Sequence, residues 1–242
     1  MSSETRTLTL QSCRHCGAGA PTEVHFCPQC DRILTLTRHG DYFSFFGLPR
    51  KLAIDLADLD ARFRRLSRQF HPDYFYTASG QERLASLERA SYLNDAYRVL
   101  KQPLDRAEYL LKIEGLPRVG THQDASELPA GVLEEVFALN EELDDIRQAR
   151  EAGVSPQELG ARLDAARRPI EERAARQEAH LETLFQRWDK QVDEQAPADV
   201  RRATLESIRS LLQERSYIAN LIATASREGG QSQATPDRGA GS

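Results

Sequence analysis

The fold of this chain is decided by residues 58–73, which read DLDARFRRLSRQFHPD. Apolar residues recur there at i, i+4, i+7 and i+11, the spacing of one face of an α-helix; they are Leu59, Phe63, Leu66 and Phe70. Arginines occupy another face of the same helix, namely Arg62, Arg65 and Arg68. Pro72 ends the helix because it lacks an N–H and disfavours the helical conformation in the residue before it. The stretch therefore predicts a basic amphipathic helix that ends in an exposed His71-Pro72-Asp73 loop.

A second helical pattern begins near Gln81, after a polar loop. Its face is Leu87, Ala90, Leu93, Asn94, Tyr97 and Leu100, so we expect a second helix that returns antiparallel to the first. A catalytic dyad of His71 and Asp73 is disfavoured, because residues two apart across a proline are expected to point in different directions and no nucleophile lies nearby. An ordinary helix stop, with Asp73 capping the next turn, is the remaining alternative.

Two helices around a His71-Pro72-Asp73 loop resemble the J-domain, the module by which co-chaperones stimulate the ATPase of DnaK-class (heat-shock-70) chaperones. The resemblance implies that the loop and the arginine face contact an acidic surface of the chaperone's ATPase domain. Oriented charges would chiefly speed and align that encounter. For the face formed by Arg62, Arg65 and Arg68, an ordinary solvated helix surface is the alternative.

The composition excludes several classes of protein. The 242 residues suffice for one large domain or two or three small ones. The net charge of −5 argues against a nucleic-acid binder, and with a mean hydropathy of −0.57 and no long apolar run we expect no membrane-spanning segment. The twelve residues before Cys13 hold no signal or transit peptide. We expect a cytoplasmic protein, or one of the mitochondrial matrix if the chain is a processed form.

The four cysteines form two pairs, Cys13-x-x-Cys16 and Cys27-x-x-Cys30. Such paired knuckles can close a tetrahedral site, and four thiolates suit Zn²⁺. Structural disulfides are disfavoured in a reducing cytosol, and a redox motif lacks the βαβ pattern around it. We therefore predict a structural zinc ribbon, in which His15 and His25 are superfluous as ligands. We expect the other parts of the chain to fold without the ribbon, because their apolar stripes do not depend on it.

The predicted fold class is mostly α, with an N-terminal zinc ribbon, a J-domain helical hairpin and a C-terminal three-helix bundle. Helical periodicity returns in three stretches, residues 132–146, 159–188 and 200–222, with apolar spacing typical of shallow-angle packing. Pro169 is expected to kink or interrupt the second stretch. The predicted segments are a ribbon (1–40), a J-domain (41–116), a linker (117–128), a C-terminal three-helix bundle (129–226) and a disordered tail (227–242).

Three segments resemble the HscB/Jac-type J-domain co-chaperones of iron–sulfur cluster assembly. They are QPLDRAEYLL at 102–111, DYFSFFGLP at 41–49 and NEELDDI at 140–146, and the resemblance extends from residue 41 to about 225. A four-cysteine ribbon ahead of the J-domain resembles a subset of that family. The resemblance implies a non-enzymatic co-chaperone that recruits an iron–sulfur cluster scaffold protein to a DnaK/HscA-type chaperone and stimulates its ATPase.

A candidate scaffold surface lies on the first C-terminal helix. Val132, Val136, Leu139, Leu143 and Ile146 already complete a core stripe there. Leu133 and Phe137 lie about 100° around the helix, and Glu141 and Asp145 continue that row. The alternative is a wide core stripe. The family resemblance places the scaffold surface on this helix and adds Tyr217 from the last helix, while Ala138 and Glu134 depart from its pattern.

The rival functions are a general J-domain chaperone and a zinc-ribbon nucleic-acid-binding factor. A general chaperone would be expected to carry a Gly/Phe-rich linker and β-rich substrate domains. A nucleic-acid factor would need basic residues at the ribbon, and residues 13–30 hold only Arg14. The sequence leaves open the oligomeric state, which chaperone is served, and whether apo or cluster-loaded scaffold is preferred.

Overall fold

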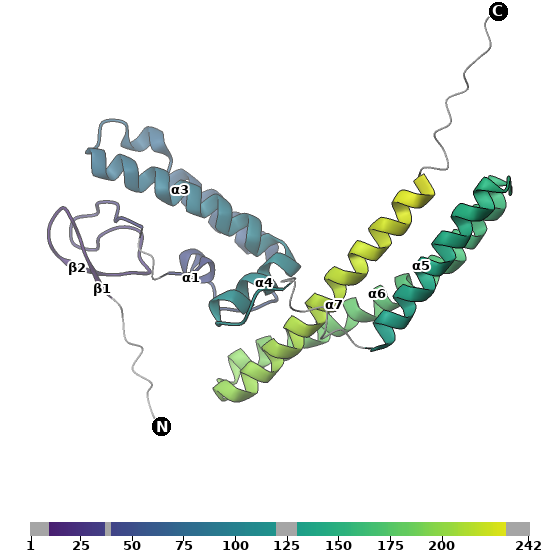
Figure 1. The fold of residues 1–242 in the computed structure, drawn as a ribbon. Helices are drawn as coiled ribbons and strands as arrows, with labels where there is room; N and C mark the ends of the chain where they lie inside the picture. Colours follow the sequence, from purple (N-terminus) through teal and green to yellow (C-terminus); the bar gives the residue numbers. More distant parts are fainter. Residues whose placement is uncertain (1–9, 37–39, 120–129, 231–242) are drawn as a thin grey trace, which may run out of the picture. The chain divides into compact units, whose positions relative to one another are not determined.

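The computed structural model describes residues 10–36, 40–119 and 130–230 (Figure 1). The chain divides into two compact units, and each is described by itself. The first unit comprises Met1–Leu116 with Asp189–Gln195, and the second comprises Pro117–Trp188 with Ala196–Ser242. Helices dominate both units, which confirms the predicted mostly-α class.

The first unit begins with the ribbon. Strand β1 (Leu10–Ser12) pairs antiparallel with β2 (Gly19–Pro21), and Gly17, with φ of 76°, makes the turn between them in a conformation that glycine adopts without strain. An isolated bridge between Phe26 and Ile33 closes a second loop. The ribbon's own buried cluster is small and consists of Cys13, Ala20, Cys27 and Leu34. So few apolar side chains cannot hold the segment together alone.

Four helices and one 3₁₀ turn follow in this unit. They are α1 (Tyr42–Phe46), α2 (Leu56–Gln69), η1 (Pro72–Phe75), α3 (Gly80–Lys101) and α4 (Pro103–Ile113). Capping boxes start α1 at Asp41 and α3 at Ser79, where a side-chain oxygen accepts a free backbone N–H. Pro103 opens α4 at a position where the missing N–H costs nothing. Local signals in the sequence thus mark where α1, α3 and α4 begin.

The apolar stripe of α2 is buried as the spacing predicts. Leu59, Leu66 and Phe70 are 0%, 3% and 0% exposed. Phe63 is half-buried and stacks on Tyr97 of α3, with ring centroids 4.2 Å apart. This face fixes α2 against α3.

The buried face of α3 differs from the predicted one. Leu87 is 54% exposed and Asn94 is exposed, so both were wrongly assigned to the packed face. The face that is buried consists of Ala85, Ser86, Arg89, Leu93, Ala96 and Leu100. The reason is tertiary: a buried arginine occupies a position that periodicity assigns to apolar residues, and its partners lie far away in the sequence.

The segment at 102–111 closes the hairpin. The backbone N–H of Tyr42 donates to the hydroxyl of Tyr109 at 3.0 Å, and the two rings stack at 4.2 Å. Arg106 is 5% exposed and donates to the carbonyl of Leu100. Within the same unit, the backbone N–H groups of Leu52 and Ala53 donate to the carboxylate of Asp189 at 2.6 and 2.7 Å.

The second unit contains the three predicted C-terminal helices, α5 (Ala130–Glu151), α6 (Pro156–Asp193, up to Trp188) and α7 (Ala198–Gly230). Leu143, Ile170 and Ile218 form a buried cluster that draws on all three helices. Farther along α6, Leu181, Leu184 and Trp188 are also buried. The bundle therefore has the predicted apolar interior, although Val200 at its edge is 39% exposed.

Two expectations for this unit need correction. Of the two effects expected at Pro169, an interruption does not occur, because α6 is helical on both sides of it; the neighbouring Ile170 is 3% exposed and belongs to the buried cluster. α7 continues to Gly230, past the predicted boundary at 226, because nothing before Gly229 and Gly230 opposes helix propagation. The rest of the predicted tail, 231–242, and most of the predicted linker lie outside the described residues.

In the part of the chain that the structure describes, no helix has the length and apolarity needed to cross a membrane.

Candidate functional site

The His71-Pro72-Asp73 loop lies on the surface between α2 and α3, as predicted. His71 caps η1, and its Nδ1 accepts the backbone N–H of Asp73 at 3.3 Å. The side chains of His71 and Asp73 are 55% and 87% exposed. Just before the loop, Phe70 is fully buried, and its carbonyl accepts the hydroxyl of Ser86 at 2.7 Å. A fixed residue thus anchors an exposed pair of polar groups.

The two polar side chains of the loop do not diverge, and the expectation that they would was wrong. Nδ1 of His71 lies 3.5 Å from Oδ2 of Asp73. The cause is η1: a 3₁₀ turn starting at Pro72 curls the chain so that the capping histidine faces the next carboxylate. The pair forms one exposed surface feature that a partner could contact as a unit.

The predicted arginine face separates into two kinds of residue. Arg62 is engaged within the chain: its Nε donates to Asp58 at 2.8 Å, and its Nη1 donates to the carbonyls of Phe46 and Gly47 at 2.9 and 3.1 Å. Arg65 and Arg68 are exposed on α2. We therefore assign Arg62 first to joining α1 and α2, and Arg65 and Arg68 to the surface that a partner could meet.

The four cysteines converge at one place in the ribbon. All four sulfur atoms lie within 4.8 Å of one another, and the pairs Cys13–Cys30 and Cys16–Cys27 are each separated by 3.7 Å. Four sulfurs bound tetrahedrally at 2.3 Å from a metal lie about 3.8 Å apart. The cysteines are free thiols. Their spacing fits a four-thiolate metal site and is too long for disulfide bonds.

Backbone N–H groups favour the thiolate form of Cys13. The N–H groups of Cys16 and His15 point at the sulfur of Cys13 and lower the pKa of its thiol to about 7. A thiolate is the form that binds a metal. The predicted ligand set of Cys13, Cys16, Cys27 and Cys30 is therefore brought together in a suitable environment.

On α5, the structure separates part of the predicted scaffold surface from the core. Leu143 and Ile146 are 2% and 3% exposed, whereas Phe137 is 67% exposed. Glu141 and Asp145 are also exposed. Phe137 is thus not part of a wide core stripe. The side chain of Leu133 lies outside the described residues.

The remaining positions of that surface complete the picture. Tyr217 on α7 is half-buried. Ala138 and Glu134, which depart from the family pattern, are both exposed. The described part of the surface therefore offers one large aromatic ring followed by two carboxylates along α5.

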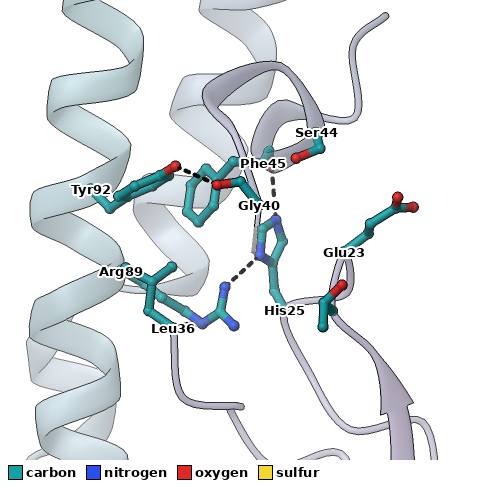
Figure 2. Close-up of a pocket in the computed structure, with 9 residues that line it drawn as sticks. Glu23, His25, Leu36, Gly40, Ser44, Phe45, Arg89 and Tyr92 are labelled. Carbon is teal, nitrogen blue, oxygen red and sulfur yellow. Dashed lines mark hydrogen bonds between the residues drawn. The ribbon is translucent and has the colours of Figure 1, made fainter. Parts of the chain in front are cut away.

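A network that the sequence reasoning missed joins the ribbon to α3 (Figure 2). The guanidinium of Arg89 lies 2.8 Å from Nδ1 of His25, and the other ring nitrogen of His25 lies 3.1 Å from the carbonyl of Phe45. Because arginine only donates, Nδ1 accepts and Nε2 donates to the carbonyl. Burial, and then the positive charge of Arg89, lowers the pKa of His25 to about 4. One signal was present: Arg89 lies four residues before Leu93, on the stripe that should be buried.

With this geometry in place, comparisons with known proteins place the chain. No protein-family model matches it. The HscB co-chaperone homologue of Vibrio parahaemolyticus is 43% identical over 106 residues, which cover 44% of this chain and 61% of that protein. That of Vibrio vulnificus is 42% identical over 112 residues, which cover 46% of this chain and 64% of that protein. Over these matched residues and in its fold, this chain is similar to the HscB co-chaperones.

Solved HscB structures share the fold. The crystal structure of human co-chaperone HscB has a TM-score of 0.61 at 24% identity, covering 90% of this chain and 98% of that one. Chaperone HscB from Vibrio cholerae has a TM-score of 0.54 at 28% identity, covering 79% and 99%. The predicted resemblance to HscB is confirmed, and the four-cysteine cluster fits the predicted subset with an N-terminal ribbon. The chain spans about three fifths of the length of the curated HscB relatives it matches.

Proposed function

We propose that this chain is a J-type co-chaperone that recruits an iron–sulfur cluster scaffold protein to a DnaK/HscA-type chaperone and stimulates its ATPase. The observation that carries the proposal is the exposed His71/Asp73 pair held on the end of a rigid, antiparallel helix hairpin. The relatives named as HscB co-chaperones support it. The chain itself would catalyse no reaction: its loop would favour the hydrolysis-competent state of the chaperone.

Two binding surfaces on one chain give the mechanism its physical basis. The first unit would bind the chaperone through the loop and the exposed Arg65 and Arg68, and the second would hold the scaffold on α5. Linking the two surfaces turns delivery of the scaffold into an intramolecular event with a raised effective concentration. Stimulation by the chain and scaffold together should therefore exceed the sum of their separate effects.

The test is single-turnover ATP hydrolysis by a heat-shock-70 chaperone, measured with the chain alone, the scaffold alone and both together. We expect faster hydrolysis with the chain and a further, more than additive increase with both. A chain that binds the scaffold but leaves hydrolysis unchanged in every combination would remove the co-chaperone proposal.

Charge on α2 should affect the rate of encounter. We expect Arg65→Glu combined with Arg68→Glu to slow association with the chaperone by roughly tenfold at low salt, because steering by exposed charges contributes 10-fold or more to association rates. The difference should shrink as salt rises, since exposed charges are screened beyond about 10 Å at 0.1 M salt. Arg62 is left intact because its bonds to α1 would be lost as well.

Stopped-flow association at several salt concentrations measures this effect. Arg98→Glu, which reverses one exposed arginine on α3, is the matched control for each single reversal, Arg65→Glu and Arg68→Glu, measured beside the double variant. Equal association rates for the parent and the double variant at low salt would show that Arg65 and Arg68 form an ordinary solvated face.

We also propose that Cys13, Cys16, Cys27 and Cys30 hold one structural Zn²⁺ in a reducing compartment. The metal would cross-link the two knuckles, and binding energies of roughly 10–16 kcal/mol in comparable peptides exceed what the small ribbon core could supply. Elemental analysis of protein purified without added metal should find about one zinc per chain. A Cys16→Ser variant should retain far less. Iron in place of zinc, or disulfides in freshly reduced lysate, would contradict the assignment.

A further inference from the structure

Arg89 is a buried cation on α3 whose hydrogen bonds reach the ribbon. It is 2% exposed. Besides its contact with His25, Nε donates to the carbonyl of Leu34 at 2.8 Å and Nη2 donates to that of Thr35 at 3.3 Å. A buried guanidinium is costly unless its donors are satisfied. The J-domain hairpin therefore depends on residues 25–35 of the ribbon to satisfy one of its own core side chains.

The same ribbon segment packs on the residue that precedes the functional loop. The ring of Phe70 lies 5.0 Å from that of His25, edge to face, and 6.1 Å from that of Phe26, stacked. The guanidinium of Arg89 lies 5.8 Å from the centroid of the Phe70 ring. Phe70 is followed directly by His71. Three groups, two of them from the ribbon, thus surround the anchor of the loop.

A further contact holds the far side of the loop. Arg32 of the ribbon pairs with Glu82 at 2.9 Å, and Glu82 completes the capping box that begins α3. Arg32 is also hydrogen-bonded to the second cysteine knuckle, because its backbone carbonyl accepts the N–H of Cys27 at 2.9 Å. The ribbon therefore contacts both the last residue before the loop and the first turn after it.

We propose that Arg89 and His25 are positioning residues that couple the four-cysteine metal site to the His71-Pro72-Asp73 loop. Residues 25–35 run through the second knuckle, Cys27 and Cys30, and supply the acceptors of Arg89. A metal bound by the four thiols fixes this segment. Loss of the metal frees it, leaves the guanidinium without acceptors and loosens the packing around Phe70. The metal state of the ribbon thereby sets how well the loop is held for the chaperone.

This coupling adds to the expectation that the other parts of the chain fold without the ribbon: the core of the hairpin stays folded, but the loop responds to the ribbon. That expectation considered only the apolar stripes of the helices, and these omit Arg89. The proposal rests on the proposed co-chaperone function for the role of the loop, but the coupling itself concerns only this chain and is measurable without a partner.

The experiment is amide hydrogen exchange of the full chain, with zinc bound and after its removal by a chelator under reducing conditions. We compare the parent with Arg89→Met and with Arg98→Met, a matched control on the exposed side of α3. In the parent, zinc removal should speed exchange at Asp73 to Tyr76 at least tenfold, while the buried positions Leu93 and Leu100 of α3 stay protected. Arg89→Met should show the fast exchange with zinc bound and respond little to zinc removal, since the two changes break one connection.

Several outcomes overturn the coupling. One is that zinc removal speeds loop exchange equally in the parent and in Arg89→Met. Another is that zinc removal leaves loop exchange unchanged while the chain stays folded. If zinc removal also unprotects Leu93 and Leu100, Arg89→Met with zinc bound decides: slow loop exchange there contradicts the proposal. If Arg89→Met does not fold, Arg89→Lys, which keeps the charge but cannot reach three acceptors, takes its place under the same criterion.

A functional readout accompanies the exchange data. Zinc removal in the parent and Arg89→Met with zinc should raise the concentration of chain needed for half-maximal ATPase stimulation by a similar factor, with Arg98→Met unchanged. If the parent stimulates no chaperone while the exchange pattern is as expected, the proposed function fails and the coupling stands. If ATPase stimulation depends on the loop, but amide exchange in the loop changes neither on zinc removal nor in Arg89→Met, only the coupling is contradicted.

Discussion

We expect His71→Gln and Asp73→Asn each to reduce stimulation of the chaperone's ATPase to the basal rate. Both side chains are exposed, so a partner can reach them, and neither fills the core. The two groups also lie 3.5 Å apart and form one surface feature, so losing either should disable the pair. Because Pro72 and Phe70 hold the backbone of the loop, each variant should keep its melting temperature and its binding to the scaffold.

Single-turnover hydrolysis, with and without scaffold, is the measurement for these variants. His180→Gln on α6 and Asp95→Asn on α3 are the matched controls, since each makes the same chemical change at an exposed position away from the loop. Full stimulation by the loop variants would show that the hairpin only resembles a J-domain. Loss of stimulation together with a lower melting temperature would instead point to a structural role for the loop.

The helices of this protein were predictable because their signals are local. The stripe from Leu59 to Phe70 repeats within one segment, and the helix-ending Pro72 follows directly after it. The same holds for α5, α6 and α7, whose apolar spacing alone predicts three helices. The cysteine pairs could also be interpreted from the sequence alone, because the spacing of metal ligands depends little on the rest of the fold.

What the sequence could not show depends on contacts between distant residues. Arg89 is buried only because His25 and Leu34 accept its hydrogen bonds. Arg62 belongs to a predicted partner surface by periodicity, yet it bonds to carbonyls at the end of α1. In each case, the hydrogen-bond partner of the polar side chain lies far away in the sequence. The helical pattern therefore does not predict it.

Other misses came from backbone geometry. A proline between His71 and Asp73 suggested divergent side chains, but a 3₁₀ turn brings them together. Pro169 was expected to kink or interrupt α6, but the helix is not interrupted there, and the neighbouring Ile170 is buried. The rules for proline describe isolated chains, and tertiary packing adjusts them.

The last prediction concerns α5. We expect Phe137→Ala, and more strongly Phe137→Ala with Leu133→Ala, to weaken binding of the scaffold by about 2–4 kcal/mol, the size of losses at interface hot spots. Aromatic rings are enriched at the centre of protein–protein interfaces, and Phe137 is 67% exposed. The melting temperature of the Phe137→Ala variant should change little, because truncating an exposed side chain leaves no cavity. Glu141 and Asp145, next along the row, should then govern the salt dependence of binding.

Calorimetric titration with the scaffold and a thermal melt of each variant provide the two measurements. Leu143→Ala on the same helix is the opposite control: its side chain is 2% exposed, so it should lose about 2–5 kcal/mol of stability and keep its affinity per folded molecule. Leu84→Ala on α3 removes another exposed apolar side chain, 57% exposed, and should change neither quantity. If Phe137→Ala behaves like Leu143→Ala, the ring serves the bundle. If it behaves like Leu84→Ala, the scaffold binds elsewhere. Only a loss of affinity at constant stability places the scaffold on this row of α5.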